Sequence, residues 1–276
     1  MNEQAAGIRA APPRDEPRLP VPFVLLTGGK GGVGKTTLAA NLGVALVRAG
    51  VRALLVDLDL GLANLNVLLR LPPRYNLEDY FAGERPLEDC LLAGPGGVHV
   101  LPAGSGSADM GRPDRTRRAL LLKGLAELAP RYDLVLGDGA AGIGPDVLAF
   151  GCAADRVLAV TSPEPAAVTD AYGVVKALHT YSTERGAEIP TPEVVVNMAR
   201  DPEEAEATAH KLRTVCERFL ARSPRLAGWL PRAREVETSA RTQRPFVLAA
   251  PESLATRSLE RLSRRVAQLV TGPGRS

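Results

Sequence analysis

Short runs of apolar residues alternate along this chain with longer stretches in which apolar residues recur every three or four positions. Apolar runs of this length predict buried strands, and the periodic stretches predict helices with one apolar face. The expected strands are 22–26, 52–57, 98–101, 134–138, 156–160, 193–197 and 226–230, and the expected helices are 38–46, 115–129, 166–181, 203–221 and 252–270. Because apolar strands alternate with helices, we predict an α/β fold: a single doubly wound, mostly parallel sheet with helices on both faces.

The two ends of the chain lie outside this pattern. Residues 1–20 are small, charged and rich in proline, which is typical of a flexible arm. We expect one domain over 21–270 and a short disordered tail over 271–276. Charged residues and prolines occupy the place of a signal peptide's apolar segment, and no apolar run approaches the ~20 residues of a membrane span. We therefore expect a cytoplasmic protein.

Composition adds two limits. The formal net charge of +3 is too small to indicate a class of partner. The three cysteines, Cys90, Cys152 and Cys216, lack the spacing of metal ligands, so we expect buried thiols in a reducing compartment.

A glycine-rich segment between the first predicted strand and the first predicted helix carries the strongest chemical signal. Residues 29–36 fit the phosphate-binding pattern G-x-x-x-x-G-K-[ST] of the P-loop. In such a loop, backbone N–H groups and the N-terminus of the next helix surround an anion. We expect Lys35 to reach the β- and γ-phosphates of a nucleotide, and the hydroxyl of Thr36 to bind Mg²⁺. The expected nucleotide-binding residues of the loop are Gly29, Lys30, Gly31, Gly32, Val33, Gly34, Lys35, Thr36 and Thr37.

Polar residues also follow three other predicted strands, at the sheet edge where ligands bind in open α/β folds. Asp57 and Asp59 follow one strand, and two carboxylates so close together need a cation or waters unless they cap a helix. Asp138 ends a second strand, as a Walker B aspartate does. Asn197 ends a third, where its amide could pair with adenine or form part of a strand-ending turn.

The run from Lys30 to Thr36 reads K-G-G-V-G-K-T, and with it this chain resembles the MinD/ParA family of P-loop ATPases, which carry a deviant Walker A motif. The resemblance implies a homodimer that closes around ATP and Mg²⁺, with Lys30 contacting phosphate on the partner's nucleotide. It implies that Lys30 and Lys35 stabilise charge during hydrolysis and that Asp59 orients the attacking water.

The same resemblance assigns the remaining site residues. It implies that Asp57 and Asp138 hold the waters around Mg²⁺, and that Asn197 reads the adenine base beside the loop containing Pro231. Two residues depart from the family's pattern. Gly139 stands where threonine or serine often follows the aspartate, and Arg232 stands where the family often has aspartate.

Within the family, the stretches 57–69, 98–106, 138–144 and 161–172 are most similar to the FlhG (FleN) branch, whose members regulate flagellar number. The arm from Glu3 to Arg9 resembles an activator segment of that branch. This implies that Glu3, Gln4 and Arg9 contact the signal-recognition-type GTPase FlhF, and Gln4 is suited to position a water for GTP hydrolysis. A flagellar transcription factor or a switch-complex protein would be a further partner.

Two rival functions are compatible with the sequence. A ParA-type partition ATPase would bind DNA through arginines between 222 and 244, although a solvated surface explains these arginines equally well. A MinD-type septum-placement ATPase would bind the inner face of the membrane through its C-terminal helix, and residues 255–269 carry an apolar stripe opposite arginines. We expect this helix to pack on the sheet instead, and we expect no DNA partner.

Overall fold

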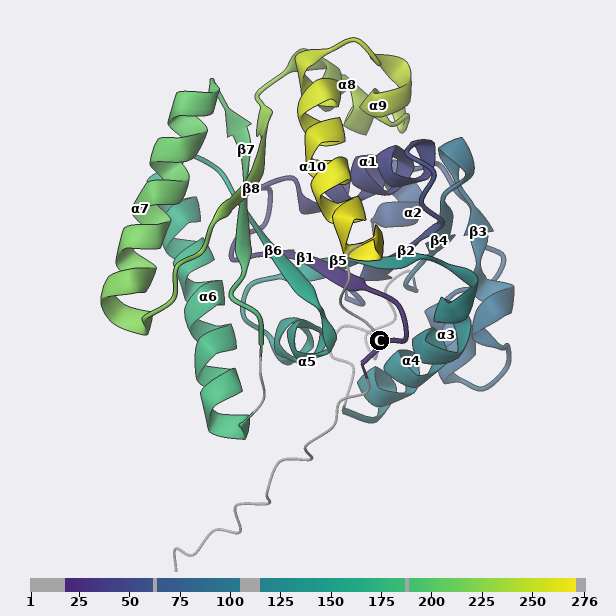
Figure 1. The fold of residues 1–276 in the computed structure, drawn as a ribbon. Helices are drawn as coiled ribbons and strands as arrows, with labels where there is room; N and C mark the ends of the chain where they lie inside the picture. Colours follow the sequence, from purple (N-terminus) through teal and green to yellow (C-terminus); the bar gives the residue numbers. More distant parts are fainter. Residues whose placement is uncertain (1–17, 62–63, 105–114, 187–188, 272–276) are drawn as a thin grey trace, which may run out of the picture.

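The fold is built on one sheet of eight strands, in the order β3-β4-β2-β5-β1-β6-β7-β8 (Figure 1). It is seen in a computed structural model that describes residues 18–61, 64–104, 115–186 and 189–271. All neighbouring strands are parallel except β3 and β4. The strands are β1 (Phe23–Gly28), β2 (Ala53–Leu58), β3 (Leu92–Ala93), β4 (His99–Leu101), β5 (Leu134–Ala141), β6 (Arg156–Thr161), β7 (Glu193–Ala199) and β8 (Leu226–Pro231).

Helices cover both faces of this sheet (Figure 1). The α-helices are α1 (Lys35–Arg48), α2 (Leu65–Leu68), α3 (Leu77–Phe81), α4 (Arg115–Leu128), α5 (Pro145–Ala153), α6 (Pro165–Arg185), α7 (Pro202–Leu220), α8 (Arg234–Thr242), α9 (Phe246–Ala249) and α10 (Leu254–Thr271). Three short 3₁₀ helices are η1 (Leu87–Cys90), η2 (Pro95–Gly97) and η3 (Ala129–Arg131). The core residues of α1, α2, α9 and α10 lie on one face, and those of α3, α4, α5 and α7, with all those of α6 except Ala167, lie on the other.

The central strand β1 shows why the apolar runs are continuous rather than alternating. Val24 and Leu26 pack into the core beneath α1 and α10, whereas Phe23 and Leu25 pack into the core beneath α4 and α5. All four side chains are fully buried. Successive side chains of a strand point to opposite faces, so a strand covered on both faces must be apolar at every position. The predicted doubly wound fold is therefore confirmed.

Every predicted strand and helix is present, with ends that differ by a few residues. Elements that the pattern did not predict are β3, α2, α3, α5, α8, α9 and the 3₁₀ helices. Most of them are too short to show a period, and the apolar residues of α5 form a nearly continuous run. Strand β5 continues to Ala141, past its predicted end, because Gly139 pairs with Leu58 and Ala141 pairs with Gly28.

The C-terminal helix α10 packs in the core, as predicted. Ala255, Leu259, Leu262 and Val266 are buried against β8 and α1, and Figure 1 shows α10 and α1 side by side on the sheet. The guanidinium of Arg265 lies 2.8 Å from Glu193 at the start of β7, which fixes the far end of the helix. In the described residues, no helix is both long and apolar enough to cross a membrane.

Candidate functional site

The predicted P-loop runs from the carboxyl end of β1 to the first turn of α1. Gly34, the N-cap residue of α1, has a φ of 84° and a ψ of 26°, a left-handed conformation that glycine adopts at little cost. The first turn of α1 contains no acidic residue, and its N-cap residue, a glycine, has no side chain that could cap it. Its free N–H groups are therefore directed at the loop, where they can bind an anion.

The loop is held in place by its neighbours. A Cβ atom added at Gly29 would lie 2.1 Å from the carbonyl oxygen of Asp170, so the loop begins in close contact with the backbone of α6. A Cβ atom added at Gly34 would lie 2.4 Å from the side-chain nitrogen of Asn197. Both contacts favour glycine at these two positions of the loop.

Lys35 lies inside this cradle, and only 8% of its surface is exposed. Burial lowers the pKa of Lys35, while the negative charges of Asp138 and Asp59 oppose that change. The structure thus brings together Lys35, Asp59 and Asp138, which were predicted from three separate segments. A buried ammonium next to two carboxylates provides a strong attraction for phosphate oxygens once Mg²⁺ offsets the carboxylates.

Asp57 and Asp138 are direct neighbours, because β2 and β5 pair in a register that places them opposite each other. Both carboxylates are almost completely buried. The Oδ1 atom of Asp57 accepts the N–H of Asp59 at 3.1 Å, and its Oδ2 accepts the N–H groups of Asn64 and Leu65 at 3.2 Å each. Burial, and then the charge of Asp138, raise the pKa of Asp57 well above its ordinary value.

Asp138 has an unsatisfied polar atom. Burial raises the pKa of Asp138 to about 7, although the Thr36 hydroxyl and the Lys35 ammonium favour the charged form. Its Oδ1 atom is buried and has no hydrogen-bond partner among the described residues. A buried carboxylate oxygen without a partner is unfavourable, so a cation or a cation-bound water fits there.

This set of residues suits Mg²⁺ with a nucleotide better than Mg²⁺ alone. Among the described residues, no group of three or more His, Cys, Asp or Glu side chains is arranged to hold a metal ion. Mg²⁺ usually keeps several waters and binds through one or two protein groups together with phosphate oxygens. Thr36 and Asp138 would supply the protein groups here.

Asn197, at the end of β7, contacts the P-loop directly. Its Nδ2 donates to the carbonyl oxygen of Val33 at 2.8 Å, and its Oδ1 accepts the N–H of Met198 at 2.9 Å. Pro231 ends β8 and pairs with Ala199, so it lies at the same edge of the sheet. In this structure the amide of Asn197 supports the P-loop, and its contact with a base stays a prediction.

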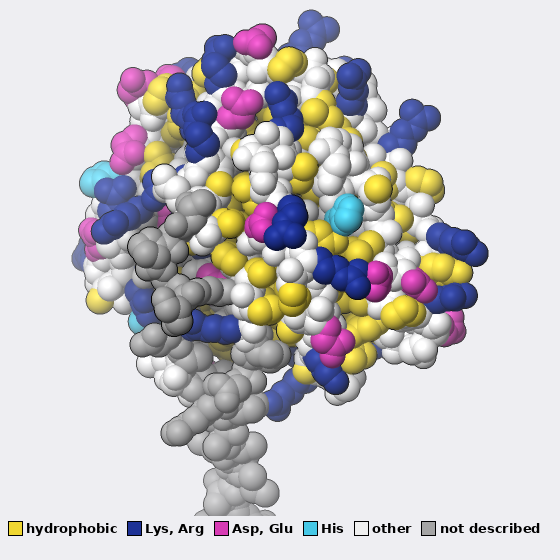
Figure 2. Space-filling view, turned by 45° about the vertical axis from the view of Figure 1, so that its right-hand side comes forward, with side chains coloured by type: hydrophobic (Ala, Val, Ile, Leu, Met, Phe, Trp, Pro, Cys, Tyr) yellow, Lys and Arg dark blue, Asp and Glu magenta, His cyan; other side chains and the backbone are white. Residues whose placement is uncertain are grey.

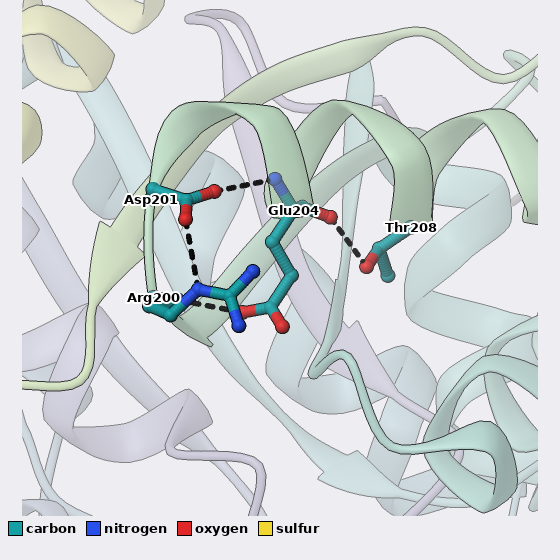
Figure 3. A network of polar contacts seen from close by, with 4 residues as sticks. All are labelled: Arg200, Asp201, Glu204 and Thr208. Atoms are coloured by element: carbon teal, nitrogen blue, oxygen red, sulfur yellow. Dashed lines mark hydrogen bonds and ion pairs between the residues drawn. The ribbon is translucent and has the colours of Figure 1, made fainter.

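The turn after Asn197 is fixed by a network of polar contacts (Figure 3). The carboxylate of Asp201, the N-cap residue of α7, accepts the N–H of Glu204 at 2.7 Å and lies 2.9 Å from the guanidinium of Arg200. The carboxylate of Glu204 in turn accepts the N–H of Arg200 at 2.6 Å. This reciprocal cap holds the segment that carries Asn197.

Lys30 differs from Lys35 in its surroundings. Its side chain is 46% exposed, and its ammonium lies 3.5 Å from the carboxylate of Glu164 at the start of α6. Glu164 is not among the predicted site residues, although its place just after the carboxyl end of β6 puts it at the ligand-binding edge of the sheet. The predicted partner-binding residues Glu3, Gln4 and Arg9 lie outside the described residues.

A P-loop between β1 and α1, with acidic residues at the ends of β2 and β5, defines a nucleotide-binding protein of the P-loop class. The sequence model of the CobQ/CobB/MinD/ParA nucleotide-binding domain matches residues 24–246. This chain therefore belongs to that family, and the predicted membership of the MinD/ParA group is confirmed.

Three known proteins illustrate the relationship. The chain is 38% identical over 247 residues to the antiactivator FleN of Pseudomonas aeruginosa, covering 90% of this chain and 86% of FleN. It is 28% identical over 252 residues to the flagellum site-determining protein YlxH of Helicobacter pylori, covering 91% of this chain and 83% of YlxH. Its fold matches the cell division ATPase MinD of Pyrococcus furiosus with a TM-score of 0.70 and 26% identity, covering 90% and 99% of the two chains.

Proposed function

We propose that this protein is a Mg²⁺-dependent ATPase that dimerises when it binds ATP and acts as a switch controlling flagellar number or placement. The observation that carries the ATPase assignment is the buried Asp138 carboxylate beside the P-loop, one oxygen of which has no partner in the part of the chain that the structure describes. That arrangement is unfavourable in the protein alone and becomes favourable when Mg²⁺ and a nucleotide are bound.

Each residue of the site has a role in this proposal. Lys35 binds the β- and γ-phosphates, and Lys30 from the partner subunit adds positive charge in the transition state. Asp59 orients the attacking water. Asp57 and Asp138 hold the waters around Mg²⁺, and Asp57 also keeps Asp59 in position by accepting its N–H. Bound Mg²⁺ would neutralise charge on the phosphates.

Two variants test these roles. Lys35→Ala should abolish turnover, because the phosphates lose their buried cation. Asp59→Ala should bind ATP and stay in the dimeric state, since only the hydrolytic step is removed. An Asp59→Ala variant that hydrolysed ATP at the normal rate would remove Asp59 from the water-orienting role.

The flagellar part of the proposal is supported by the similarity to FleN and YlxH. Leu19 is buried in the core that contains Phe23 and Leu25, so the domain begins before residue 21, its predicted start. We further propose that the residues before it form an arm outside the ATPase domain, and that Glu3, Gln4 and Arg9 bind the GTPase FlhF. A flagellar transcription factor or a switch-complex protein would receive the signal of the ATP-bound dimer. The protein would act in the cytoplasm, with transient contact at the inner face of the membrane as the alternative.

Neither rival function is favoured by a specific observation. On the face drawn in Figure 2, Lys and Arg side chains are dispersed and lie among Asp and Glu side chains rather than forming one basic patch. The apolar residues of α10 that a lipid-binding helix would expose are buried in the core.

The test of the flagellar role is GTP hydrolysis by the cognate FlhF with and without this protein. Stimulation that is lost in Gln4→Ala, and kept in the neighbouring control Asn2→Ala, would support the role of the arm. An absence of stimulation by the unaltered protein would leave the ATPase assignment intact and reject FlhF as the target.

A further inference from the structure

A pocket of about 410 Å³ lies at the edge of the sheet opposite the candidate nucleotide site. Its lining includes Arg18 before β1, Asp155 before β6, Pro190 before β7 and Arg222 before β8. These four strands are parallel, so their amino ends meet at one edge of the sheet and their carboxyl ends at the other. We call this hollow the amino-edge pocket, and the length of the strands separates it from the P-loop.

Arg222 is a cation without an anionic partner in this pocket. Its Nε donates to Nδ1 of His179 at 3.2 Å, and its Nη1 donates to the hydroxyl of Thr191 at 3.2 Å. In the described part of the chain, no ion pair joins Arg222 to a carboxylate. The side chain is half-buried, so its charge is partly removed from water and the site favours an anion.

The other charged groups of the pocket leave it with an excess of positive charge. Arg18 contributes a second guanidinium. Asp155 contributes the opposing charge, and its Oδ2 accepts the N–H of Phe23 at 2.8 Å, which holds this carboxylate against the start of β1. Two guanidinium groups facing one carboxylate fit a ligand that brings one further carboxylate, the group that arginine binds with the best geometry.

The chain itself carries carboxylates within reach of the pocket. Arg18 is the first described residue, and 17 residues precede it, with Asp15 and Glu16 next to Pro17. An extended chain spans at most about 3.6 Å per residue, so the Cα atoms of Asp15 and Glu16 lie within about 11 Å of the Cα of Arg18. Leu19 is buried and anchors the chain at this point. A ligand tethered so closely acts at an effective concentration in the millimolar range, so even a weak contact would be occupied.

We propose that the amino-edge pocket binds a carboxylate of Asp15 or Glu16 and thereby docks the base of the N-terminal arm on the domain. Residues 1–14 then leave the domain at the edge opposite the nucleotide site. A GTPase bound by Glu3, Gln4 and Arg9 would be held away from the face at which two subunits close around ATP. The docking is independent of the proposed function, and only this consequence for the GTPase rests on it.

The strength of a single ion pair limits the size of the effect. An exposed pair favours its contact by up to about fivefold, and a charged hydrogen bond that is better shielded from water by roughly tenfold or more. Because Arg222 is half-buried, we expect the docked arm to outweigh the undocked arm by about three- to tenfold at low salt. This ratio should fall as the salt concentration rises.

The experiment is limited cleavage by trypsin without nucleotide, quantified by mass spectrometry at low and high salt. Trypsin cleaves after arginine, and docking should protect the bond after Arg14 because Asp15 follows it. The bond after Arg9 is the internal reference, so the measured quantity is the ratio of the two cleavage rates.

The variants change either the pocket or the arm. Arg222→Gln removes the cation of the pocket, and Arg225→Gln is the control at an exposed position three residues further on. The arm variant combines Asp15→Asn with Glu16→Gln, and a last variant adds Arg222→Gln to it. Each ratio is divided by the ratio for a free peptide with the same residues 1–21, which corrects for the effect of residues 15 and 16 on trypsin itself. Melting temperatures show whether each variant is folded.

We expect Arg222→Gln and the arm variant each to raise the corrected ratio about three- to tenfold at low salt, and Arg225→Gln to leave it unchanged. Adding Arg222→Gln to the arm variant should have no further effect. An arm variant with the ratio of the unaltered protein would overturn the proposal, and this variant decides alone if Arg222→Gln fails to fold. A folded Arg222→Gln variant with an unchanged ratio would overturn it as well. Since no nucleotide or GTPase is present, neither result bears on the proposed function.

Discussion

Replacement of Asp138 by asparagine is expected to stabilise the free protein while removing its response to Mg²⁺ and ATP. The pKa of Asp138 in the folded protein is about 7, because the carboxyl is buried. An aspartate in an unfolded chain has a pKa of about 3.9. The difference between the two pKa values lowers the free energy of unfolding by up to about 4 kcal/mol at pH 8. That energy opposes folding, since only the folded state buries the charge.

The sign of the pH dependence follows from proton binding. Between about pH 4 and pH 7 the folded protein holds a proton on Asp138 that the unfolded chain has lost, so the free energy of unfolding falls as the pH rises. Above pH 7 this contribution is constant and unfavourable. The asparagine side chain of the variant carries no charge at any pH, so the variant should lack this fall. Its buried amide still needs partners, so we expect a net gain of roughly 1–3 kcal/mol at pH 8.

The assay is urea unfolding in EDTA at pH 5 and pH 8, followed by the fluorescence of Trp229, the single tryptophan of the chain. The free energy of unfolding of Asp138→Asn should be greater than that of the unaltered protein at pH 8 and should approach it at pH 5. The control Asp89→Asn, at an exposed position, should change stability by less than about 0.5 kcal/mol. Addition of Mg²⁺ and ATP at about 100 times the dissociation constant should stabilise the unaltered protein by about 2.7 kcal/mol and the Asp138→Asn variant much less. An Asp138→Asn variant that is less stable than the unaltered protein at pH 8 in EDTA would show that the buried charge of Asp138 does not destabilise the free protein.

Three further predictions follow from single contacts. Leu259→Ala should lower the free energy of unfolding by about 2–5 kcal/mol, because this side chain of α10 is fully buried. The unaltered protein should not sediment with anionic vesicles, and vesicle binding would contradict core packing of α10. Asn197→Ala should weaken ATP binding in calorimetry by roughly tenfold through loss of its hydrogen bond to Val33, and unchanged affinity would show that the loop does not need this support. Gly29→Ala should lower the melting temperature of the free protein. The control Gly31→Ala should not, because no atom lies within 4 Å of its added Cβ. Equal effects of the two variants would contradict the close packing of Gly29 against α6.

The sequence was sufficient to predict the sheet and the edge at which the site lies. Continuous apolar runs such as 134–138 indicate strands buried on both faces, and the glycine spacing of residues 29–36 indicates a phosphate loop. Polar residues at strand ends then converge by topology, because parallel strands end at one edge. The register that pairs Asp57 with Asp138 follows from the order of β2 and β5, which no local pattern reveals.

Contacts between distant segments could not be predicted in this way. The hydrogen bond from Asn197 to Val33 joins residues 164 positions apart. The contact between Lys30 and Glu164 likewise depends on the packing of α6 beside the P-loop. Asparagine, lysine and glutamate are common at the ends of strands and in loops. Their identity alone therefore does not indicate which residue each of them contacts in the folded protein.

The most direct test of the account is the rate of ATP hydrolysis per chain, measured with Mg²⁺ over a wide range of protein concentrations. We expect this rate to rise with concentration as dimers form and then to reach a plateau, and we expect Lys30→Ala to abolish the rise. A rate per chain that is independent of concentration and unchanged in Lys30→Ala would contradict hydrolysis by an ATP-bound dimer.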